Sequence, residues 1–432
     1  MPLSWRCHDR VILHGWGSRF QEETDDSRHG VNGADRPKVI VVGGGPVGLV
    51  TAMRLGHFGV DTVVVESDAT VSRALKASTF HPPTLDMLDA YGITPRLIEA
   101  GLVAPTWQVR MHATNEYAEF DLSVLKNDTA HPYRLQTEQW KLAEFLIEHI
   151  RENLPNVELL MGYKLVSVAQ DAESVTAQVQ ASDGTQRTLT GRYLVGADGA
   201  RSTVRDALSL SFEGHTFPET TVLATTDFPF HEHIPTLSYI NYCWAETGTF
   251  SLLRLPGIWR VSLYPWEGET LEEAITPPSI ERKLQHIYPR DVPYNVMEIR
   301  PYRIHQRVVD RYVHGRIVLA GDAAHVNSPS GGMGMNGGIH DAFNLSEKLK
   351  RILNGESADL LEQYQRQRRP IAIKHVLEQS GRNRARMQER GEEKRRETLH
   401  GLMRKANDPV QAREYLLETS MITGLRESNE IE

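Results

Sequence analysis

The chain has 432 residues, of which 40% are hydrophobic, and 48 Lys plus Arg against 56 Asp plus Glu give a formal net charge of −8. This length predicts two or three domains, the acidic balance argues against non-specific nucleic-acid binding, and no apolar run reaches the ~18 residues of a membrane-spanning helix. The two cysteines, Cys7 and Cys243, have neither metal-like nor redox spacing, which excludes a disulfide framework and favours a cytoplasmic setting.

Residues 1–37 precede the first predicted element. The segment is rich in Arg, His, Asp and Gly and carries acids in close succession near its middle. It has neither the continuous apolar stretch of a secretory signal nor the acid-poor composition of a transit peptide. We expect a disordered extension. The alternatives are that Trp5, Trp16 and Phe20 pack on the body, or that the start codon is assigned too far upstream.

A strand–turn–helix–strand pattern follows from Lys38. The apolar residues 39–42 lead into the turn Gly43-Gly44-Gly45-Pro46-Val47-Gly48, which fits G-x-G-x-x-G, and the second strand ends on Glu66. This order predicts a βαβ unit that opens a parallel sheet. Such glycines let main-chain N–H groups reach a pyrophosphate at the positive end of the helix, and an acid about 20 residues later accepts ribose hydroxyl groups. The predicted dinucleotide-binding residues here are Gly43, Gly45, Pro46, Val47, Gly48, Glu66 and Ser67.

The next segments alternate between hairpins and a helix. Period-2 alternation near residues 103–121 and from 163 to 189 predicts antiparallel hairpins inserted between nucleotide-binding pieces. Between them, residues 138–153 form a predicted amphipathic helix capped by Thr137. Residues 212–299 are predicted to be strands and turns, with aromatic residues spaced as in a sheet with one packed face. This sheet is the expected substrate layer.

The last part of the chain returns to a buried strand and then becomes helical. Residues 317–320 lead to Gly321-Asp322, a Gly-rich loop and a helix expected from about Gly338 to Leu353. Beyond Gln363 the sequence is densely charged, and the mixed signs from 384 to 396 are typical of a solvated helix face.

Two further strand ends place an Asp beside glycine, in Tyr193-Leu194-Val195-Gly196-Ala197-Asp198-Gly199 and in Ile317-Val318-Leu319-Ala320-Gly321-Asp322. With the first Gly-rich turn and Gly331-Gly332-Met333-Gly334-Met335-Asn336-Gly337-Gly338, they closely resemble the three fingerprints of the class A FAD-dependent aromatic hydroxylases, typified by p-hydroxybenzoate hydroxylase. The resemblance spans about residues 38–375 and is to the compact type, without the thioredoxin-like tail of the longer branch. Met333 stands where many relatives have glutamine.

The resemblance implies an α/β fold: a Rossmann-like FAD-binding domain with an inserted mixed or antiparallel β-sheet substrate domain and a C-terminal helical segment. The expected segments are 38–210 and 301–375 for the FAD-binding domain, 211–300 for the substrate-binding sheet and 376–432 for the charged C-terminal helices.

The resemblance also implies which residues bind FAD. Glycines of the turn would hold the pyrophosphate, Glu66 the adenosine ribose and Asp322 a ribitol hydroxyl group. The amides of Met335 and Asn336 would face the flavin edge where negative charge develops, because a helix N-terminus stabilises such charge. Either Arg73 or Lys76 matches a basic residue that contacts the cofactor phosphates. The other residues assigned to the cofactor are Gln136, near the ribityl chain, and Asp198, Gly321, Gly332 and Gly334.

The family reaction sets the demands on the substrate site. NADH or NADPH reduces the flavin, O2 gives a C4a-hydroperoxide, and this species hydroxylates a phenolic or hydroxylated heteroaromatic ring, with loss of a ring substituent where the attacked carbon bears a leaving group. The protein must supply a closed aromatic pocket with one or two polar handles. The candidate catalytic and substrate-contacting residues are His305, Tyr239, Tyr242, Arg254 and Pro329, and no metal site is expected, since His231-Glu232-His233 lacks a third ligand at helical spacing.

Two other interpretations remain open. A non-hydroxylating FAD enzyme, either a reductase or halogenase-like, has the same fold, although the halogenase segment Trp-x-Trp-x-Ile-Pro is absent. A flavin-binding interaction protein would use the charged C-terminal helices to bind a partner and would not consume NAD(P)H. The favoured hydroxylase has a small aromatic substrate, O2 and NAD(P)H as partners, binds neither nucleic acid nor membrane, and uses the C-terminal helices for a homodimer.

Overall fold

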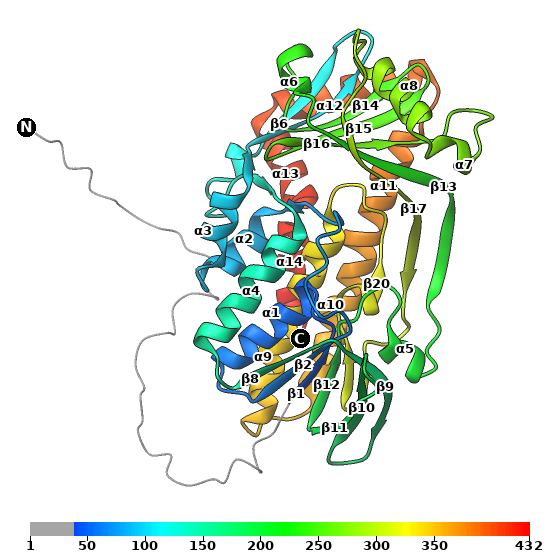
Figure 1. Cartoon of the computed structure of the whole chain (residues 1–432). Helices are drawn as coiled ribbons and strands as arrows, with labels where there is room; N and C mark the ends of the chain where they lie inside the picture. The colour runs from blue at the N-terminus through cyan, green and yellow to red at the C-terminus, as the bar shows by residue number, and fades with distance from the viewer. Residues whose placement is uncertain (1–38) are drawn as a thin grey trace, which may run out of the picture.

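The computed structural model describes residues 39–432 (Figure 1), and the extension expected at residues 1–37 lies outside them. The lower half of the molecule contains a six-stranded sheet. Its order is β18 (Val313–His314), β19 (Ile317–Leu319), β12 (Tyr193–Gly196), β1 (Val39–Val42), β2 (Thr62–Glu66) and β8 (Val157–Met161). All neighbours are parallel except β18 and β19. The apolar β1 is buried along its whole length, as a strand covered on both faces must be.

Helices and a second sheet cover this parallel sheet. The helices α1 (Pro46–His57), α4 (Gln139–Asn153) and α9 (Met333–Leu353) pack against it together with a three-stranded antiparallel sheet of β9 (Tyr163–Gln170), β10 (Val175–Ala181) and β11 (Gln186–Gly191). One continuous hydrophobic core joins these layers. The predicted βαβ unit and the hairpins at residues 163–189 are therefore confirmed.

The start of α4 differs from the prediction. The cap position is Glu138, which makes no capping side-chain hydrogen bond, so the assignment of Thr137 as the cap was wrong. Thr137 follows β7 (Arg134–Gln136) of a small sheet in the order β3 (Thr79–Phe80), β7, β4 (Leu102–Ala104). Its hydroxyl group donates to the carbonyl oxygen of Ala100 at 3.4 Å instead of accepting from the helix.

The upper half of the molecule is built on an eight-stranded sheet (Figure 1). Its order is β20 (His325–Val326), β17 (Val296–Val308), β13 (Glu213–Thr226), β16 (Ile258–Leu263), β15 (Gly248–Leu255), β14 (Ile240–Ala245), β5 (Thr106–Met111) and β6 (Tyr117–Asp121). The expected segment boundaries cut across this sheet. Strands β5 and β6 come from the segment 38–210, and β17 runs from 211–300 into 301–375.

Helices from two parts of the chain pack on the eight-stranded sheet. Helices α7 (Leu271–Ala274) and α8 (Pro277–Ile287) join a core with Leu252 and Val261. The helices after α11 (Glu378–Gln388) are α12 (Glu392–Asn407), α13 (Pro409–Thr419) and α14 (Ile422–Glu430). Leu399 and Leu416 from these helices are fully buried in a core with β5 and β6. Most of the charged pattern therefore marks the outer side of these helices, although Arg395 of α12 is buried and donates to the carbonyl oxygen of Ala245.

Within residues 39–432, no helix combines the length and the apolar character needed to cross a bilayer. In the same range, no three His, Cys, Asp or Glu side chains are arranged to hold a metal ion. The ring of His233, in α6 (Phe230–His233), stacks on Phe228 with 4.8 Å between ring centroids.

Candidate active site

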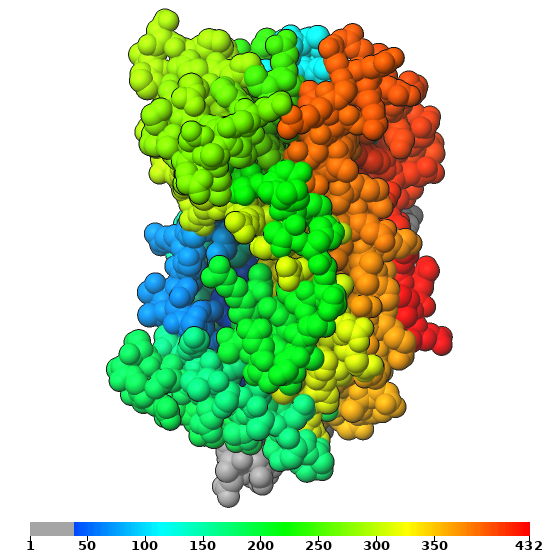
Figure 2. All heavy atoms as spheres, turned by 90° about the vertical axis from the view of Figure 1, so that its right-hand side faces the viewer, coloured from blue at the N-terminus to red at the C-terminus, as the bar shows by residue number. Residues whose placement is uncertain are grey.

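A cavity of about 910 Å³, here called the main cavity, connects the two large sheets. At one end it is lined by the Gly-rich turn after β1, the end of β2, and the strand-end residues Asp198 and Asp322. At the other end it is lined by side chains of β14 to β17, and the loop before α9 forms a wall between the two ends. Figure 2 shows a hollow on this face, where blue atoms from the start of the described chain lie behind green strands.

Three glycines of the first turn differ in what an added Cβ atom would contact. Gly43 has a φ of +111°, and a Cβ atom on it would lie 2.3 Å from the carbonyl oxygen of Ala197. A Cβ atom on Gly48 would lie 1.9 Å from the carbonyl oxygen of Gly43. Gly45 has no neighbouring atom within 4 Å of the same position and lines the main cavity with Pro46 and Val47. The turn is therefore closed toward the protein and open toward the cavity, at the positive end of α1.

Glu66 is fixed at the end of β2. Its Oε2 accepts the main-chain N–H of Gly44 at 2.6 Å, and its Oε1 accepts the N–H of Asp68 at 2.8 Å and the hydroxyl of Ser67 at 3.0 Å. Glu66 and Ser67 both line the main cavity. The carboxylate thus lies beside the turn, at the position predicted for a ribose-binding acid.

Asp198 and Asp322 end neighbouring strands and both line the main cavity. Burial raises the pKa of Asp198, whose carboxylate accepts the hydroxyl of Ser202 at 2.5 Å and the N–H of Val204 at 3.1 Å. Asp322 has no hydrogen-bond or ion-pair partner among residues 39–432, and its side chain reaches the open space of the cavity. The surrounding walls nevertheless raise its pKa. Asp322 is therefore available to a ligand, whereas Asp198 organises its own loop.

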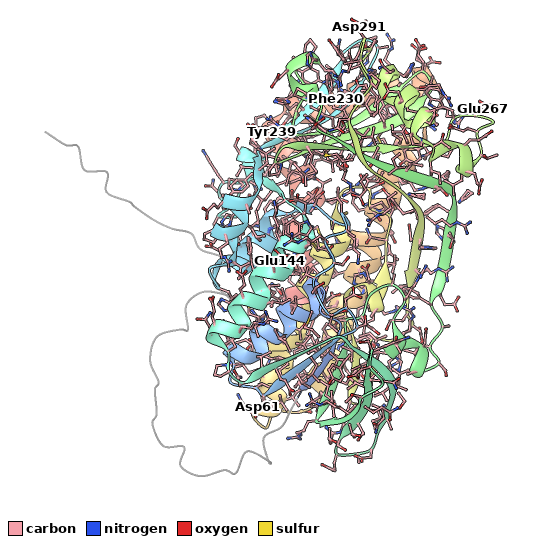
Figure 3. The ribbon with its side chains drawn as sticks, viewed as in Figure 1. Asp61, Glu144, Phe230, Tyr239, Glu267 and Asp291 are labelled. Atoms are coloured by element: carbon pink, nitrogen blue, oxygen red, sulfur yellow. The ribbon has the colours of Figure 1, made fainter. Side chains whose placement is uncertain are left out.

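The two candidate phosphate-contacting cations are separated. Arg73 lies outside the main cavity, pairs with Glu144 at 2.9 Å and lies over the ring of Trp140. Figure 3 shows Glu144 on the outer side of α4. Lys76 lines the main cavity and has no ion-pair partner among the residues that the structure describes.

Helix α9 begins at Met333, five residues before the predicted start at Gly338. Glycine disfavours a helix interior, but close packing outweighs that preference here, because a Cβ atom on Gly338 would lie 2.6 Å from Val47 and one on Gly321 would lie 2.8 Å from the same side chain. The consequence is that the helix N-terminus itself faces the main cavity. The cavity residues from this loop and helix include Pro329, Gly332, Gly334 and Met335.

The side chain of Asn336 ties this loop together and does not reach the cavity. It is fully buried, accepts the N–H of His81 at 2.9 Å, and donates to the carbonyl oxygens of Thr79 and Gly332. Gln136 is also fully buried: its Oε1 accepts the hydroxyl of Thr79 at 2.6 Å, while its Nε2 has no partner among residues 39–432. An unpartnered buried amide is costly.

A buried ion cluster supports the strand end before Asp322. Asp341 accepts the main-chain N–H of Gly321 at 3.1 Å and pairs with His325 at 2.8 Å and Arg368 at 2.7 Å. Burial alone would raise the pKa of Asp341, but Arg368 and His325 lower it to about 2. This cluster joins the strand end, α9 and α10 (Asp359–Ile371) beneath the cavity.

The opposite end of the main cavity is made of side chains selected by strand register. Ser251 pairs with Tyr242 on one side and with Ser262 on the other, and Leu253 pairs with Arg260, so these side chains share one face. The residues of this end that line the cavity are Tyr242, Phe250, Ser251, Leu253, Arg260, Ser262, Tyr264, Tyr302 and Met387.

Arg260 and Tyr264 are the notable polar groups of this end. Arg260 donates to the carbonyl oxygen of Lys76 at 2.9 Å and to the hydroxyl of Ser78 at 3.2 Å, while its Nε has no partner and no carboxylate within the described chain pairs with it. Burial, with the adjoining Tyr302, raises the pKa of Tyr264 to about 12. The wall therefore offers one unneutralised cation and neutral hydroxyl groups.

Of the candidate catalytic residues, the structure brings Tyr242 and Pro329 to the main cavity but not the other three. Arg254 contacts the ring of Tyr239 at 5.8 Å, and Figure 3 shows Tyr239 near the edge of the upper half. His305 bonds to the hydroxyl of Thr216 at 2.9 Å. The physical reason is that successive side chains of a strand point to opposite faces of the sheet. Arg254 directly follows Leu253, which lines the cavity, and His305 comes three residues after Tyr302, so both side chains lie on the face away from the cavity.

The sequence did contain a signal for the residues that were missed. In Ile258-Trp259-Arg260-Val261-Ser262-Leu263, the residues Trp259, Val261 and Leu263 are buried on one face. Alternation then places Arg260 and Ser262 together on the other face. Two polar side chains on the face of a strand opposite the core indicate that this face borders a cavity.

Known proteins resemble the chain along most of its length. Residues 36–379 match the family described as "FAD binding domain". Para-nitrophenol 4-monooxygenase of Pseudomonas sp. strain WBC-3 is 34% identical over 397 residues, which cover 90% of this chain and 96% of that protein. The 6-hydroxy-3-succinoylpyridine 3-monooxygenase of Pseudomonas putida strain S16 is 35% identical over 79% of this chain and 86% of its own. The crystal structure of p-nitrophenol 4-monooxygenase from Pseudomonas putida DLL-E4 has a TM-score of 0.84 at 32% identity, covering 90% of this chain and 98% of that one.

Proposed function

Because the chain belongs to the FAD-binding family that its residues 36–379 match, we propose that it is a FAD-dependent monooxygenase that hydroxylates a phenolic or hydroxypyridine ring. The observation that carries this proposal is the continuity of the main cavity. The Gly-rich turn and the face of β14 to β16 line the same space, so a dinucleotide and a small ring fit end to end. The names of two relatives specify a nitrophenol and a hydroxypyridine, and each of these compounds has a single six-membered ring.

The residues present fit FAD. The open position at Gly45 admits a pyrophosphate against the N-terminus of α1, and Glu66 would accept ribose hydroxyl groups. The partnerless Asp322 would accept a ribitol hydroxyl group, and the orphaned Nε2 of Gln136 lies beside Thr79, which lines the cavity. Lys76, and not Arg73, is our choice for the phosphate contact, because only Lys76 lines the cavity.

Bound FAD supplies the chemistry of O2 activation with electrons from NAD(P)H, and the protein's residues control the conditions around it. The main-chain N–H groups at Gly334 and Met335 open α9 and would stabilise negative charge at their side of the cavity. Leu253, Phe250 and Met387 would exclude water from the ring. Pro329 would fix the position of the loop before α9, which lines the cavity.

The substrate class follows from the charges at the ring end. Arg260 has no carboxylate partner within the described chain, so its charge would attract a phenolate or another anionic ring. Tyr242 and Tyr264 would offer hydroxyl groups to the ring substituents, and the raised pKa of Tyr264 keeps its hydroxyl protonated as a donor. Loss of a substituent would follow when the attacked carbon bears a leaving group.

Partners and setting belong to the same proposal. NADH or NADPH would act as co-substrate with O2, and the free buried thiol of Cys243 suits a reducing cytoplasm. The charged outer side of α12 is the surface we assign to a homodimer. Light scattering of the purified protein tests the dimer.

One experiment tests the proposed reaction. The purified protein is examined for a flavin spectrum, and oxidation of NADH and NADPH is followed with a panel that includes p-nitrophenol and hydroxypyridines, while O2 uptake and H2O2 are measured. We expect one ring class to stimulate oxidation many-fold with little H2O2. Oxidation that no ring stimulates, or that ends entirely in H2O2, contradicts the proposal. Asp322→Ala is the control for flavin dependence and should purify without flavin.

A further inference from the structure

A second cavity, of about 360 Å³, lies at the end of the eight-stranded sheet. We call it the vestibule. It is lined by the turn between β14 and β15, the residues after β16, the side chains of Lys283 and His286 from α8, and the segment between α11 and α12. Figure 3 shows Glu267, one of its lining residues, at the outer edge of the upper half, so the vestibule reaches the surface.

The vestibule and the main cavity share a wall. Phe250, Tyr264 and Met387 line both spaces. These are side chains on three different segments, namely β15, the residue after β16, and α11. A flexible Met among aromatic rings can rearrange without a change in the main chain. The wall therefore separates the two spaces at the ring end of the main cavity by side chains that can move.

The chemistry of the vestibule suits an aromatic anion. Trp266 and the two shared rings provide aromatic surface, and Lys283 lies 5.1 Å from the Trp266 ring. Lys283 is ion-paired with Glu269 at 2.5 Å and Arg390 with Glu267 at 3.7 Å. Arg395 donates to the main-chain carbonyl oxygens of Glu389 and Ala245 and has no carboxylate partner among the described residues, so it is the lining cation open to an anion. The buried Nε2 of Gln388, which has no partner among residues 39–432, offers a donor to a phenolic oxygen.

The hollow of the main cavity is less suited to this passage. The blue atoms that Figure 2 shows there come from the first part of the described chain, whose cavity residues, among them Gly45 and Glu66, line the cofactor end. The strands that carry Arg260 and Tyr264 lie at the opposite end, where the vestibule adjoins them through Tyr264. The vestibule is therefore the approach that leads to the ring end without passing the cofactor end.

We propose that the vestibule is a transient binding site and the passage for the aromatic substrate, with Phe250, Tyr264 and Met387 as its movable inner wall. This inference rests on the proposed function, because it assumes that a ring binds beside the flavin. It gives these three residues a role in access in addition to their place around the bound ring.

A reversible block of the vestibule tests the proposal. Thr249 lines the vestibule only, so Thr249→Cys in a Cys7→Ser background places one thiol there. Cys243 remains unreactive, because burial raises its pKa to about 12. The holoenzyme is treated with benzyl methanethiosulfonate, and stopped-flow absorbance of the flavin gives the rate constants for binding and release of a phenol. Reduction with dithiothreitol, followed by desalting, removes the block.

A blocked passage slows entry and exit alike. We expect both rate constants to fall by about tenfold or more while the Kd changes less than about twofold, with full recovery after reduction. Thr190→Cys on β11, labelled in the same way, is the matched control and should leave both rate constants unchanged. Unchanged rate constants in the blocked Thr249→Cys protein, or a raised Kd with unchanged entry, overturn the proposal. Flavin absorbance requires no turnover, so a ring that binds but does not stimulate NAD(P)H oxidation contradicts the proposed function alone, and a protein that binds no ring contradicts both.

Discussion

At the cofactor end of the main cavity, glycines, strand ends and helix N-termini form the surface, whereas at the ring end side chains of four strands form it. The turn at Gly43 leaves no room for a Cβ atom, and Asp322 lies above a buried ion cluster. At the ring end, the side chains of Ser251, Ser262 and Arg260 project from a sheet whose strands are paired through the main chain, so the pairing does not depend on these side chains.

This contrast separates what the fold fixes from what it leaves adjustable. A change at the cofactor end alters the main chain, so stability and FAD binding should fall together. A change at the ring end alters only a side chain on a strand, so the protein should keep its fold and its flavin and lose affinity for the ring. The four substitutions below test this separation.

The largest effect is expected from Gly43→Ala. The substitution combines a φ of +111° with a contact of 2.3 Å to the carbonyl oxygen of Ala197, which should cost about 5 kcal/mol and displace the turn. We expect protein purified without flavin, as measured by the ratio of absorbance at 450 to that at 280 nm, and a lower unfolding temperature.

The matched control is Gly59→Ala, because Gly59 also has a positive φ, +74°, but no atom within 4 Å of the added Cβ position. It should cost only about 1–2 kcal/mol and leave the flavin content unchanged. Equal flavin loss in both variants would mean that the Gly43 turn has no special role.

Asp341→Asn should destabilise the cofactor end without touching the cavity surface. It leaves Arg368 buried without its carboxylate partner, at a cost of about 3–5 kcal/mol in the free energy of unfolding. Denaturant titration of the unliganded protein measures this cost, and weaker flavin retention should accompany it, because Gly321 loses its charged acceptor.

The same residue predicts a pH dependence. Its pKa in the folded protein is about 2, below the ordinary value of 3.8, so its contribution to stability is complete above about pH 4 and is lost as the pH falls toward 2. The unfolding free energy of the wild type should therefore fall more steeply over this interval than that of Asp341→Asn. Parallel curves would show that Arg368 and His325 do not stabilise the carboxylate.

Arg260→Gln tests the ring end. A lost hydrogen bond to a charged group is worth about 1.5–3 kcal/mol, so we expect the KM for an anionic phenol to rise roughly 10- to 100-fold. The flavin should be retained, and the unfolding temperature should fall only slightly, through loss of the bonds to Lys76 and Ser78. Arg254→Gln, on the neighbouring strand but facing Tyr239, should leave the KM unchanged. A larger effect at Arg254 than at Arg260 would reverse the assignment of the wall.

The same contrast explains what the sequence could predict. Gly43 and Glu66 are close in the sequence to the strands that position them, so their spacing indicates a dinucleotide site, whereas Asp198 and Asp322 were assigned to the cofactor through the family resemblance. The start of α9 was misplaced because helix propensity is local, whereas the packing of Gly338 on Val47 is a tertiary contact.

Residues of the ring end depend on register between strands far apart in the chain. A shift of one residue exchanges the two faces, so the prediction that Arg254 contacts the substrate took the face of β15 opposite to that of Leu253, which lines the cavity. The aromatic composition of residues 239–266 indicated a sheet, but the pairing of Ser251 with Ser262 was not available from spacing alone.

The smallest effect is expected from Tyr264→Phe, which removes one hydroxyl and keeps the ring that separates the vestibule from the main cavity. A single neutral hydrogen bond is worth about 1 kcal/mol, so the KM for the ring should rise roughly fivefold. Because the pKa of Tyr264 is about 12, its hydroxyl stays protonated at neutral and mildly alkaline pH, and the ratio of the two KM values should be constant from pH 6 to 9. Tyr239→Phe, outside the cavity, is the control and should have no effect. A ratio that changes through pH 7–9 would mean that Tyr264 ionises during binding and exchanges a proton with the ring, which would make it part of the chemistry instead of a fixed donor.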